Sequence, residues 1–280
     1  MEKEMKYGDD YKFIPATSIG NGVGVEVLSD IYCYTIQIVN ICLFGEKDAD
    51  DFVLIDAGMP NSAEEIIKVT ESRYGNRQPR AIILTHGHFD HVGAILELVN
   101  YWNIPVYAHE LEIPYLTGVK SYPEPDPSVE GGVIAKVSGL FPNEPIDLTN
   151  HVKPLPADGT VPFMADFKWL HTPGHTDGHV SFFREKDQTL IVGDAFVTVK
   201  QDALYKVFTQ EVEVNGPPRY FTPDWEASRK SVEKLAELNP IVAVTGHGQP
   251  VSGEGLKTGL KRLVDGFDNI AVPDHGKYLN

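Results

Sequence analysis

The stretch Thr85-His86-Gly87-His88-Phe89-Asp90-His91 follows the apolar run Ala81–Leu84 directly. It carries three imidazoles and one carboxylate within six residues, the side chains that Zn²⁺ and similar ions prefer in catalytic sites. In an extended turn His86 and His88 point the same way and can reach one ion. Asp90 and His91 begin the next predicted helix and can face a second ion. Gly87 lets the backbone fold tightly. The stretch therefore predicts a metal site at the end of a buried strand.

Three further apolar strands end in a histidine or an aspartate. His175 follows the strand Phe167–His171, Asp194 ends the strand Thr189–Val192, and His247 follows the strand Ile241–Val244. A carboxylate at the end of an apolar strand is costly to bury unless a cation pairs with it. We therefore expect these loops to meet at one rim of a pair of sheets. His171 and His179 lie nearby, and we expect His179 to have a structural or supporting role.

The donors suffice for two ions. One ion takes His86, His88 and His175, the other takes Asp90, His91 and His247, and Asp194 is shared. Each ion keeps an open position for water, as catalytic sites do. Two cations that share a hydroxide generate a nucleophile at neutral pH and stabilise the developing oxyanion. This set predicts a metallo-hydrolase in which Asp90 is also catalytic, because it can orient the nucleophile or accept a proton.

In its order and spacing, His86-x-His88-x-Asp90-His91 followed by His175, Asp194 and His247 resembles the metallo-β-lactamase superfamily over about residues 22–250. The resemblance implies an α/β fold, a four-layer αββα sandwich of two mixed β-sheets. It implies two divalent metal ions, Zn²⁺ first, with Mn²⁺ or Fe²⁺ as alternatives. It also implies that Asp56, in Asp56-Ala57-Gly58, supports the ligands without binding metal itself.

Within the superfamily, the pattern is similar to the glyoxalase II and lactonase branch, because Asp194 stands where class B β-lactamases carry a cysteine ligand. Only about thirty residues follow His247, which leaves little room for the helical substrate domain of glyoxalase II. Lactonases carry a tyrosine a few residues after the shared aspartate, whereas Tyr205 lies eleven residues after Asp194. We expect hydrolysis of a small-molecule ester, thioester, lactone or amide. The alternatives are a mononuclear iron enzyme similar to sulfur dioxygenases and a phosphodiester hydrolase on the same site.

The charge balance limits the partners. The 280 residues contain 24 Lys and Arg against 40 Asp and Glu, a net charge of −16. Such a chain repels phosphate backbones and anionic lipid. We therefore expect a small-molecule substrate and neither nucleic acid nor a membrane as a partner. The N-terminal sequence does not resemble a signal peptide and no apolar run approaches a membrane span, which favours a cytoplasmic protein. The sequence does not predict an oligomeric state.

The chain is expected to form one domain, 1–280, with a proline- and glycine-rich lid or insertion at 111–156. Cys33 and Cys42 lie in apolar surroundings and are expected to be buried free thiols. Strands are expected at Gly22–Leu28, Tyr32–Val39 and Phe52–Ile55. Helices are expected from Pro60 to Gly75 with Ser62 as N-cap, from about Val92 to Tyr101, and from Thr222 to about Leu238 with Thr222 as N-cap.

Overall fold

The computed structural model describes residues 4–12, 14, 17–130, 132–199 and 208–279. By its internal contacts the chain divides into two compact units, which we describe separately. The first unit comprises the described residues of Met1–Ala16, together with Asn21–Tyr122 and Pro142–Ala165. The second unit comprises the described residues of Thr17–Gly20, Pro123–Phe141 and Asp166–Asn280.

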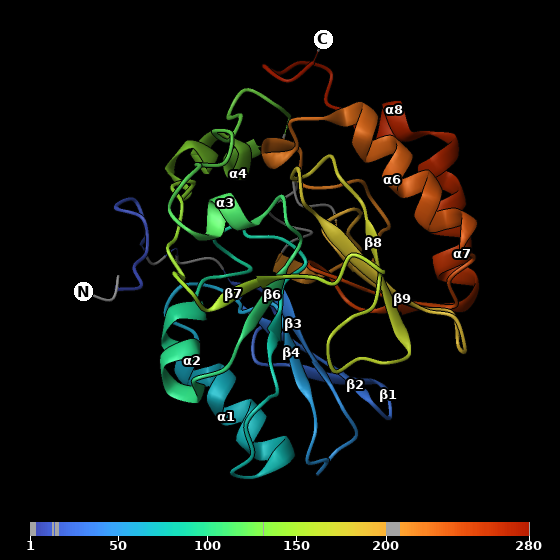
Figure 1. Cartoon of the computed structure of the whole chain (residues 1–280). Helices are drawn as coiled ribbons and strands as arrows, with labels where there is room; N and C mark the ends of the chain where they lie inside the picture. The colour runs from blue at the N-terminus through green and yellow to red at the C-terminus, as the bar shows by residue number, and fades with distance from the viewer. Residues whose placement is uncertain (1–3, 13, 15–16, 131, 200–207, 280) are drawn as a thin grey trace. The chain divides into compact units, whose positions relative to one another are not determined.

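The first unit contains a mixed sheet whose strands follow one another in chain order. Neighbours from β1 to β4 are antiparallel, and neighbours from β4 to β7 are parallel. The helices α1 and α2 lie side by side next to this sheet (Figure 1). The described elements of this unit are β1 (Gly24–Leu28), β2 (Ile31–Ile36), β3 (Val39–Phe44), β4 (Val53–Ile55), α1 (Ala63–Tyr74), β5 (Ile82–Ile83), α2 (Ile95–Trp102), β6 (Val106–Ala108), α3 (Ile113–Leu116) and β7 (Val152–Pro154).

The second unit contains a smaller mixed sheet in the order β12-β11-β10-β9-β8, in which only the β10–β11 pair is parallel among the described strands. Apolar side chains of α6 and α7, among them Val232, Leu235 and Leu260, pack with Leu190 and Val192 of β10 in one core. Its described elements are α4 (Gly132–Val137), a 3₁₀ turn (Ser138–Leu140), β8 (Phe167–His171), β9 (Val180–Arg184), β10 (Thr189–Gly193), a 3₁₀ turn (Arg219–Phe221), α6 (Trp225–Glu237), β11 (Val242–Thr245), β12 (Val251–Ser252), α7 (Gly253–Asp265) and α8 (Phe267–Ile270).

Two mixed sheets with flanking helices confirm the predicted fold class. Most predicted elements are also present, and β8 has the predicted bounds. Cys33 lies opposite Cys42 in the β2–β3 pair, and both are buried free thiols, as expected. No helix in the described part of the chain is long and apolar enough to cross a membrane.

The predicted strand Tyr32–Val39 is wrong, because the chain turns within it. Residues 31–36 and 39–44 form the hairpin β2–β3, with Gln37 at a positive φ of 58° between them. The side-chain oxygen of Asn21 accepts a hydrogen bond from the Gln37 backbone N–H at 2.6 Å. A contact from sixteen residues away stabilises this turn, so no local glycine or proline marks it in the sequence.

The N-cap of α6 is Asp224 rather than the predicted Thr222. The Asp224 carboxylate accepts a hydrogen bond from the Ala227 backbone N–H at 2.9 Å. The Thr222 hydroxyl instead donates to the Pro218 carbonyl at 2.8 Å. Ser62 does occupy the N-cap position of α1, but its hydroxyl donates backwards to the Met59 carbonyl rather than to the helix.

The segment 111–156 has more regular structure than its proline content indicates, since it contains α3, α4 and β7. By contacts, it belongs to the first unit up to Tyr122, to the second unit over Pro123–Phe141, and to the first unit again from Pro142. Its role as a lid, and the organisation of the chain as one domain, stay predictions.

Candidate metal centre

In the first unit, the turn between β5 and α2 gathers three of the predicted ligands. The ring centroids of His86 and His88 are 4.8 Å apart, and those of His86 and His91 are 4.1 Å apart. Asp90 belongs to the same turn, and all four side chains are buried. The helix predicted from Val92 begins only at Ile95, so the ligands lie in irregular backbone before it.

Asp56 supports this turn in the way that the resemblance implies. Its carboxylate accepts hydrogen bonds from the Thr85 backbone N–H at 2.8 Å, from the Thr85 hydroxyl at 2.8 Å and from His91 Nδ1 at 2.9 Å. Asp56 itself has φ of 61°, a conformation that aspartate tolerates better than most residues. The buried Asp56 carboxylate thus fixes Thr85 and His91, the two ends of the turn that carries the predicted ligands.

The hydrogen bonds also determine which nitrogen of each ring carries the proton. The carboxylate of Asp56 accepts from His91 Nδ1. The Thr85 hydroxyl donates to Asp56, so its oxygen accepts from His86 Nδ1 at 3.0 Å. Both rings therefore carry their proton on Nδ1 and present the lone pair of Nε2, which is the state that a metal ligand needs.

The turn at Asp56 packs directly against the chain that follows His91. The Gly93 N–H donates to the Gly58 carbonyl at 2.7 Å, and a β-carbon on Gly93 would lie 2.2 Å from the Met59 carbonyl carbon. The same β-carbon would lie 2.3 Å from the nitrogen of Pro60. Only glycine fits at this approach of two backbones.

We therefore expect Gly93→Ala to destabilise the metal-free protein by about 3 kcal/mol, since the obstructing atoms are backbone and cannot rotate away. Urea unfolding followed by circular dichroism measures the loss. Gly139→Ala is the matched control, because a β-carbon there meets no atom within 4 Å. Equal midpoints for the two variants would contradict the close approach at Gly93.

Two residues that the sequence analysis missed contact the same turn. The Glu112 carboxylate accepts a hydrogen bond from the Gly87 N–H at 3.0 Å and a short one from the Tyr122 hydroxyl. Burial, and then the neighbouring Glu112 carboxylate, raise the pKa of Tyr122 well above its usual value. The sequence did contain a signal for Glu112. Its carboxylate follows shortly after the apolar strand Val106–Ala108, the same pattern that identified the predicted ligands.

In the second unit, the other three predicted ligands converge. Asp194 Oδ2 lies 3.2 Å from His247 Nε2 and 3.6 Å from His175 Nε2. The Thr222 hydroxyl donates to Pro218, so its oxygen accepts from His175 Nδ1 at 3.2 Å. His175 therefore also presents the lone pair of Nε2 toward the aspartate. All three side chains are buried.

His179 has the supporting role expected for it. Its Nε2 accepts the Asp194 backbone N–H at 2.8 Å, so its proton lies on Nδ1, 2.9 Å from the Thr172 hydroxyl oxygen. This pair of hydrogen bonds fixes the backbone that carries Asp194. Tyr205, the tyrosine considered after Asp194, lies outside the described residues.

The chemistry of the donors fits metal ions in both units. Each unit presents buried imidazole nitrogens together with a carboxylate, and three of the rings have the proton on the nitrogen away from the cluster. Unprotonated imidazole and ionised carboxylate are what a divalent cation requires.

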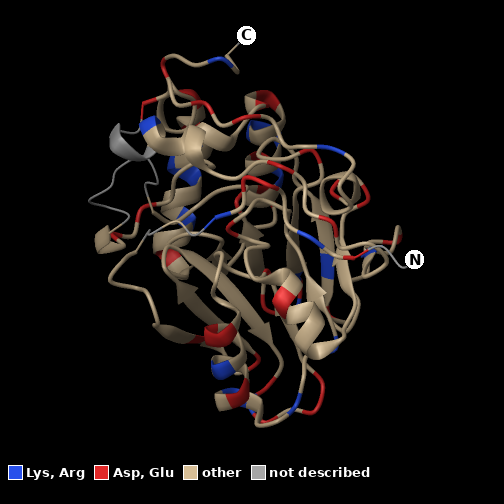
Figure 2. Ribbon diagram, turned by 90° about the vertical axis from the view of Figure 1, so that its left-hand side faces the viewer, with Lys and Arg blue, Asp and Glu red and all other residues tan. Residues whose placement is uncertain are grey.

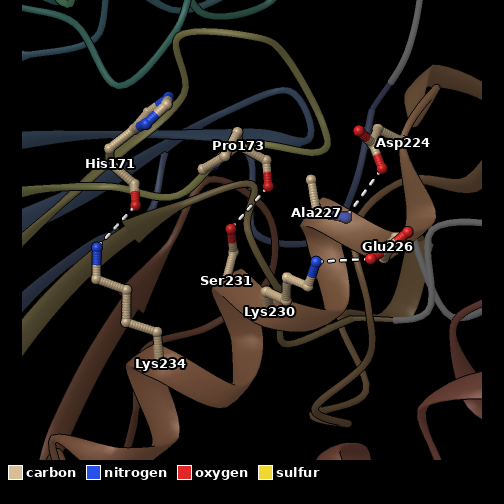
Figure 3. Close-up of a pocket in the computed structure, with 8 residues that line it drawn as sticks. All are labelled: His171, Pro173, Asp224, Glu226, Ala227, Lys230, Ser231 and Lys234. Carbon is tan, nitrogen blue, oxygen red and sulfur yellow. Dashed lines mark hydrogen bonds and ion pairs between the residues drawn. The ribbon is translucent and has the colours of Figure 1, made fainter.

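His171 belongs to a different pocket, of about 340 Å³, beside the start of α6 (Figure 3). The polar groups of this pocket bond to one another. Lys234 donates to the His171 carbonyl at 3.0 Å, Ser231 donates to the Pro173 carbonyl at 2.7 Å, and Lys230 pairs with Glu226. None of the seven predicted ligands lines it, so we assign it no role in the metal chemistry.

Acidic and basic residues are distributed along the whole described chain. Figure 2 shows Asp and Glu spread over helices and loops, with Lys and Arg interspersed among them. The expected absence of nucleic-acid and membrane partners stays a prediction that rests on net charge.

The family model described as "Metallo-beta-lactamase superfamily" matches residues 35–247, more than half of the chain. "Probable metallo-hydrolase YflN" of Bacillus subtilis (strain 168) is 45% identical over 260 residues, which cover 92% of this chain and 98% of YflN. "Hydroxyacylglutathione hydrolase GloC" of Haemophilus influenzae is 26% identical over 221 residues, covering 76% and 90% of the two chains.

The chain is also similar to solved structures. A crystal structure of TTHA1623 in a di-iron-bound form is 28% identical, with a TM-score of 0.51, and covers 76% of this chain and 89% of that one. The archaeal protein ST1585 from Sulfolobus tokodaii, at 22% identity and a TM-score of 0.56 over 90% of this chain and 84% of that one, supports the fold alone. The chain therefore belongs to the metallo-β-lactamase superfamily, and its predicted class, a metallo-hydrolase, agrees with these relatives.

Proposed function

We propose that this chain is a dinuclear metal-dependent hydrolase that cleaves a small-molecule ester, thioester, lactone or amide. The observation that carries the proposal is the state of the ligands: His86, His91 and His175 each hold a proton on Nδ1 through a buried hydrogen bond and present Nε2. Hydrogen bonding satisfies any buried imidazole, and here it leaves Nε2 of all three rings unprotonated, which is the state that a metal ligand requires.

The proposed ligand sets are those that the family pattern implies. One ion is held by His86, His88 and His175, the other by Asp90, His91 and His247, and Asp194 is shared. When bound, the two cations lower the pKa of a water molecule and stabilise negative charge on a carbonyl oxygen. Zn²⁺ is our first choice, with Mn²⁺ and Fe²⁺ as alternatives. Iron remains an alternative because TTHA1623 has a crystal structure in a di-iron-bound form.

The remaining roles belong to the chain itself. Asp90 is proposed to orient the attacking water or to accept its proton. Asp56 keeps Nε2 of His91 unprotonated, and Thr222 does the same for His175. His179 holds the backbone N–H of Asp194. The segment 111–156 is proposed to act as a lid over the substrate.

The proposed partners follow from the net charge. We propose a small-molecule substrate, because a net charge of −16 disfavours nucleic acid and anionic membranes. We also propose a cytoplasmic location. The similarity to GloC, a hydroxyacylglutathione hydrolase, puts thioesters first among the candidate substrates.

The test is a substrate panel with the metal-loaded protein. We expect turnover of a chromogenic thioester or lactone, and loss of turnover after chelation that Zn²⁺ or Mn²⁺ restores. Turnover of a chromogenic phosphodiester alone would favour the phosphodiester hydrolase instead. Oxygen consumption with a persulfide, dependent on one iron, would favour the oxidoreductase.

A further inference from the structure

Glu112 is a fully buried carboxylate that belongs to neither proposed ligand set. Burying a carboxylate is costly unless hydrogen bonds compensate for the lost water. Here Oε2 accepts the backbone N–H of Gly87 at 3.0 Å and the hydroxyl of Tyr122. Both donors lie at the ligand turn of the first unit. The carboxylate therefore fixes the backbone between His86 and His88, from a residue 25 positions away in the sequence.

Tyr122 contacts a proposed ligand directly. Its ring lies at a steep angle to the His88 ring, with 4.6 Å between the centroids. On its other side the Tyr122 ring stacks on Tyr115, with 4.0 Å between centroids and an interplanar angle of 4°. Stacking and the hydrogen bond to Glu112 together hold the tyrosine in one orientation. An immobile ring against His88 limits the angles that the imidazole can adopt.

The identity of residue 87 supports the same arrangement. A β-carbon on Gly87 would lie 2.4 Å from the Tyr122 hydroxyl oxygen and 3.0 Å from Cδ2 of Leu116. Glycine thus allows the turn to approach Glu112 and Tyr122 closely enough for the Gly87 N–H to reach the carboxylate.

We propose that Glu112 and Tyr122 are positioning residues that orient the His88 imidazole for metal binding. This inference rests on the proposed function. Glu112 acts on the backbone before His88, and Tyr122 acts on the His88 ring. Neither touches the metal. The Tyr122 hydroxyl donates to Glu112, and this hydrogen bond fixes the orientation of the tyrosine ring.

The experiment measures Zn²⁺ affinity by competition with a chromogenic chelator, for the wild type, Glu112→Ala, Glu112→Gln and Tyr122→Phe. Loss of a residue that orients a ligand typically weakens metal binding by about 10–100-fold. We expect Glu112→Ala to raise the dissociation constant of one Zn²⁺ ion per chain within that range. Glu112→Gln keeps one acceptor oxygen and should restore part of the affinity. Tyr122→Phe keeps the ring and loses its hydrogen bond, so its loss should be smaller than that of Glu112→Ala.

Glu110→Gln is the matched control, because Glu110 is exposed and precedes Glu112 by two residues. Its Zn²⁺ affinity should equal that of the wild type. A spectroscopic measurement accompanies the titration: with Co²⁺ in place of Zn²⁺, the visible absorption bands of Glu112→Gln and Tyr122→Phe should shift relative to wild type, because they depend on ligand geometry.

The possible results distinguish a failure of the positioning role from a failure of the proposed function. Wild-type Zn²⁺ affinity and Co²⁺ spectra in all three variants would overturn the positioning role and leave the proposed function intact. A lower melting temperature of the metal-free variants, with unchanged Zn²⁺ affinity at a temperature where they are folded, would overturn it as well. A wild-type chain that binds no Zn²⁺ or Co²⁺ would overturn both. If Glu112→Ala does not fold, the Gln and Phe variants decide.

Discussion

Replacing Asp194 with alanine is expected to abolish binding of at least one metal ion and to lower kcat/KM by about 1,000-fold. Asp194 is the only proposed ligand shared by both ions, and in the second unit its Oδ2 faces Nε2 of both His175 and His247. Electrostatic stabilisation by the metals contributes several kcal/mol, and each 1.36 kcal/mol corresponds to about tenfold in rate. His86→Ala is expected to cause a similar loss.

Metal content by elemental analysis and kcat/KM on the best substrate of the panel measure this prediction. Asp265→Ala is the control, because Asp265 is exposed and pairs with Lys261 on the same helix face. The fold of Asp194→Ala should remain, since its backbone N–H still reaches His179. Full metal occupancy together with full turnover in Asp194→Ala would show that the ligand assignment is wrong.

The second large effect is expected from Asp56→Asn, which keeps the shape of the side chain. The carboxylate accepts three hydrogen bonds, two from Thr85 and one from His91. An amide offers one oxygen, so its NH₂ group must face either the Thr85 N–H or His91 Nδ1. In the first case a buried donor loses its partner, at about 1–3 kcal/mol. In the second, His91 must move its proton to Nε2, where it blocks metal binding.

We therefore expect Asp56→Asn to weaken metal binding by at least about 10-fold. It should also lower the stability of the metal-free protein by about 1–3 kcal/mol. Metal competition titration and urea unfolding measure the two effects. Asp51→Asn is the control, since Asp51 is exposed and its partner is the surface residue Arg80. Wild-type affinity and stability in Asp56→Asn would mean that the carboxylate does not set the tautomer of His91.

The residues proposed as ligands could be identified as candidates because each lies next to a strand end in the sequence. His86 to His91 form one local motif, and Asp194 ends an apolar strand. Predicting the strands was therefore enough to assign these residues to the loops at the strand ends. The structure gathers His86, His88 and His91 within the first unit, and His175, Asp194 and His247 within the second.

The supporting residues could not be predicted as easily, because their contacts are non-local. Glu112 reaches Gly87 across 25 residues, and Thr222 reaches His175 across 47. Thr222 was predicted as the N-cap of a helix, but Asp224 is the cap and the Thr222 oxygen accepts from His175 Nδ1 instead. The turn at Gln37 was missed for the same reason, since Asn21 stabilises it from a distance.

The substrate and the branch of the superfamily depend on segments without a recognisable motif. The predicted lid, 111–156, contains α3, α4 and β7. The sequences of these elements contain no motif that identifies a substrate. Substrate recognition arises from shape and from a few placed polar groups rather than from a residue pattern.

Elemental analysis of the purified chain tests the central claim most directly. We predict about two divalent ions per chain, mostly zinc or manganese, or a pair of iron ions, and a turnover rate that rises with metal occupancy. About one iron per chain, with oxygen-dependent activity on a persulfide and none on thioesters or lactones, would contradict the dinuclear hydrolase.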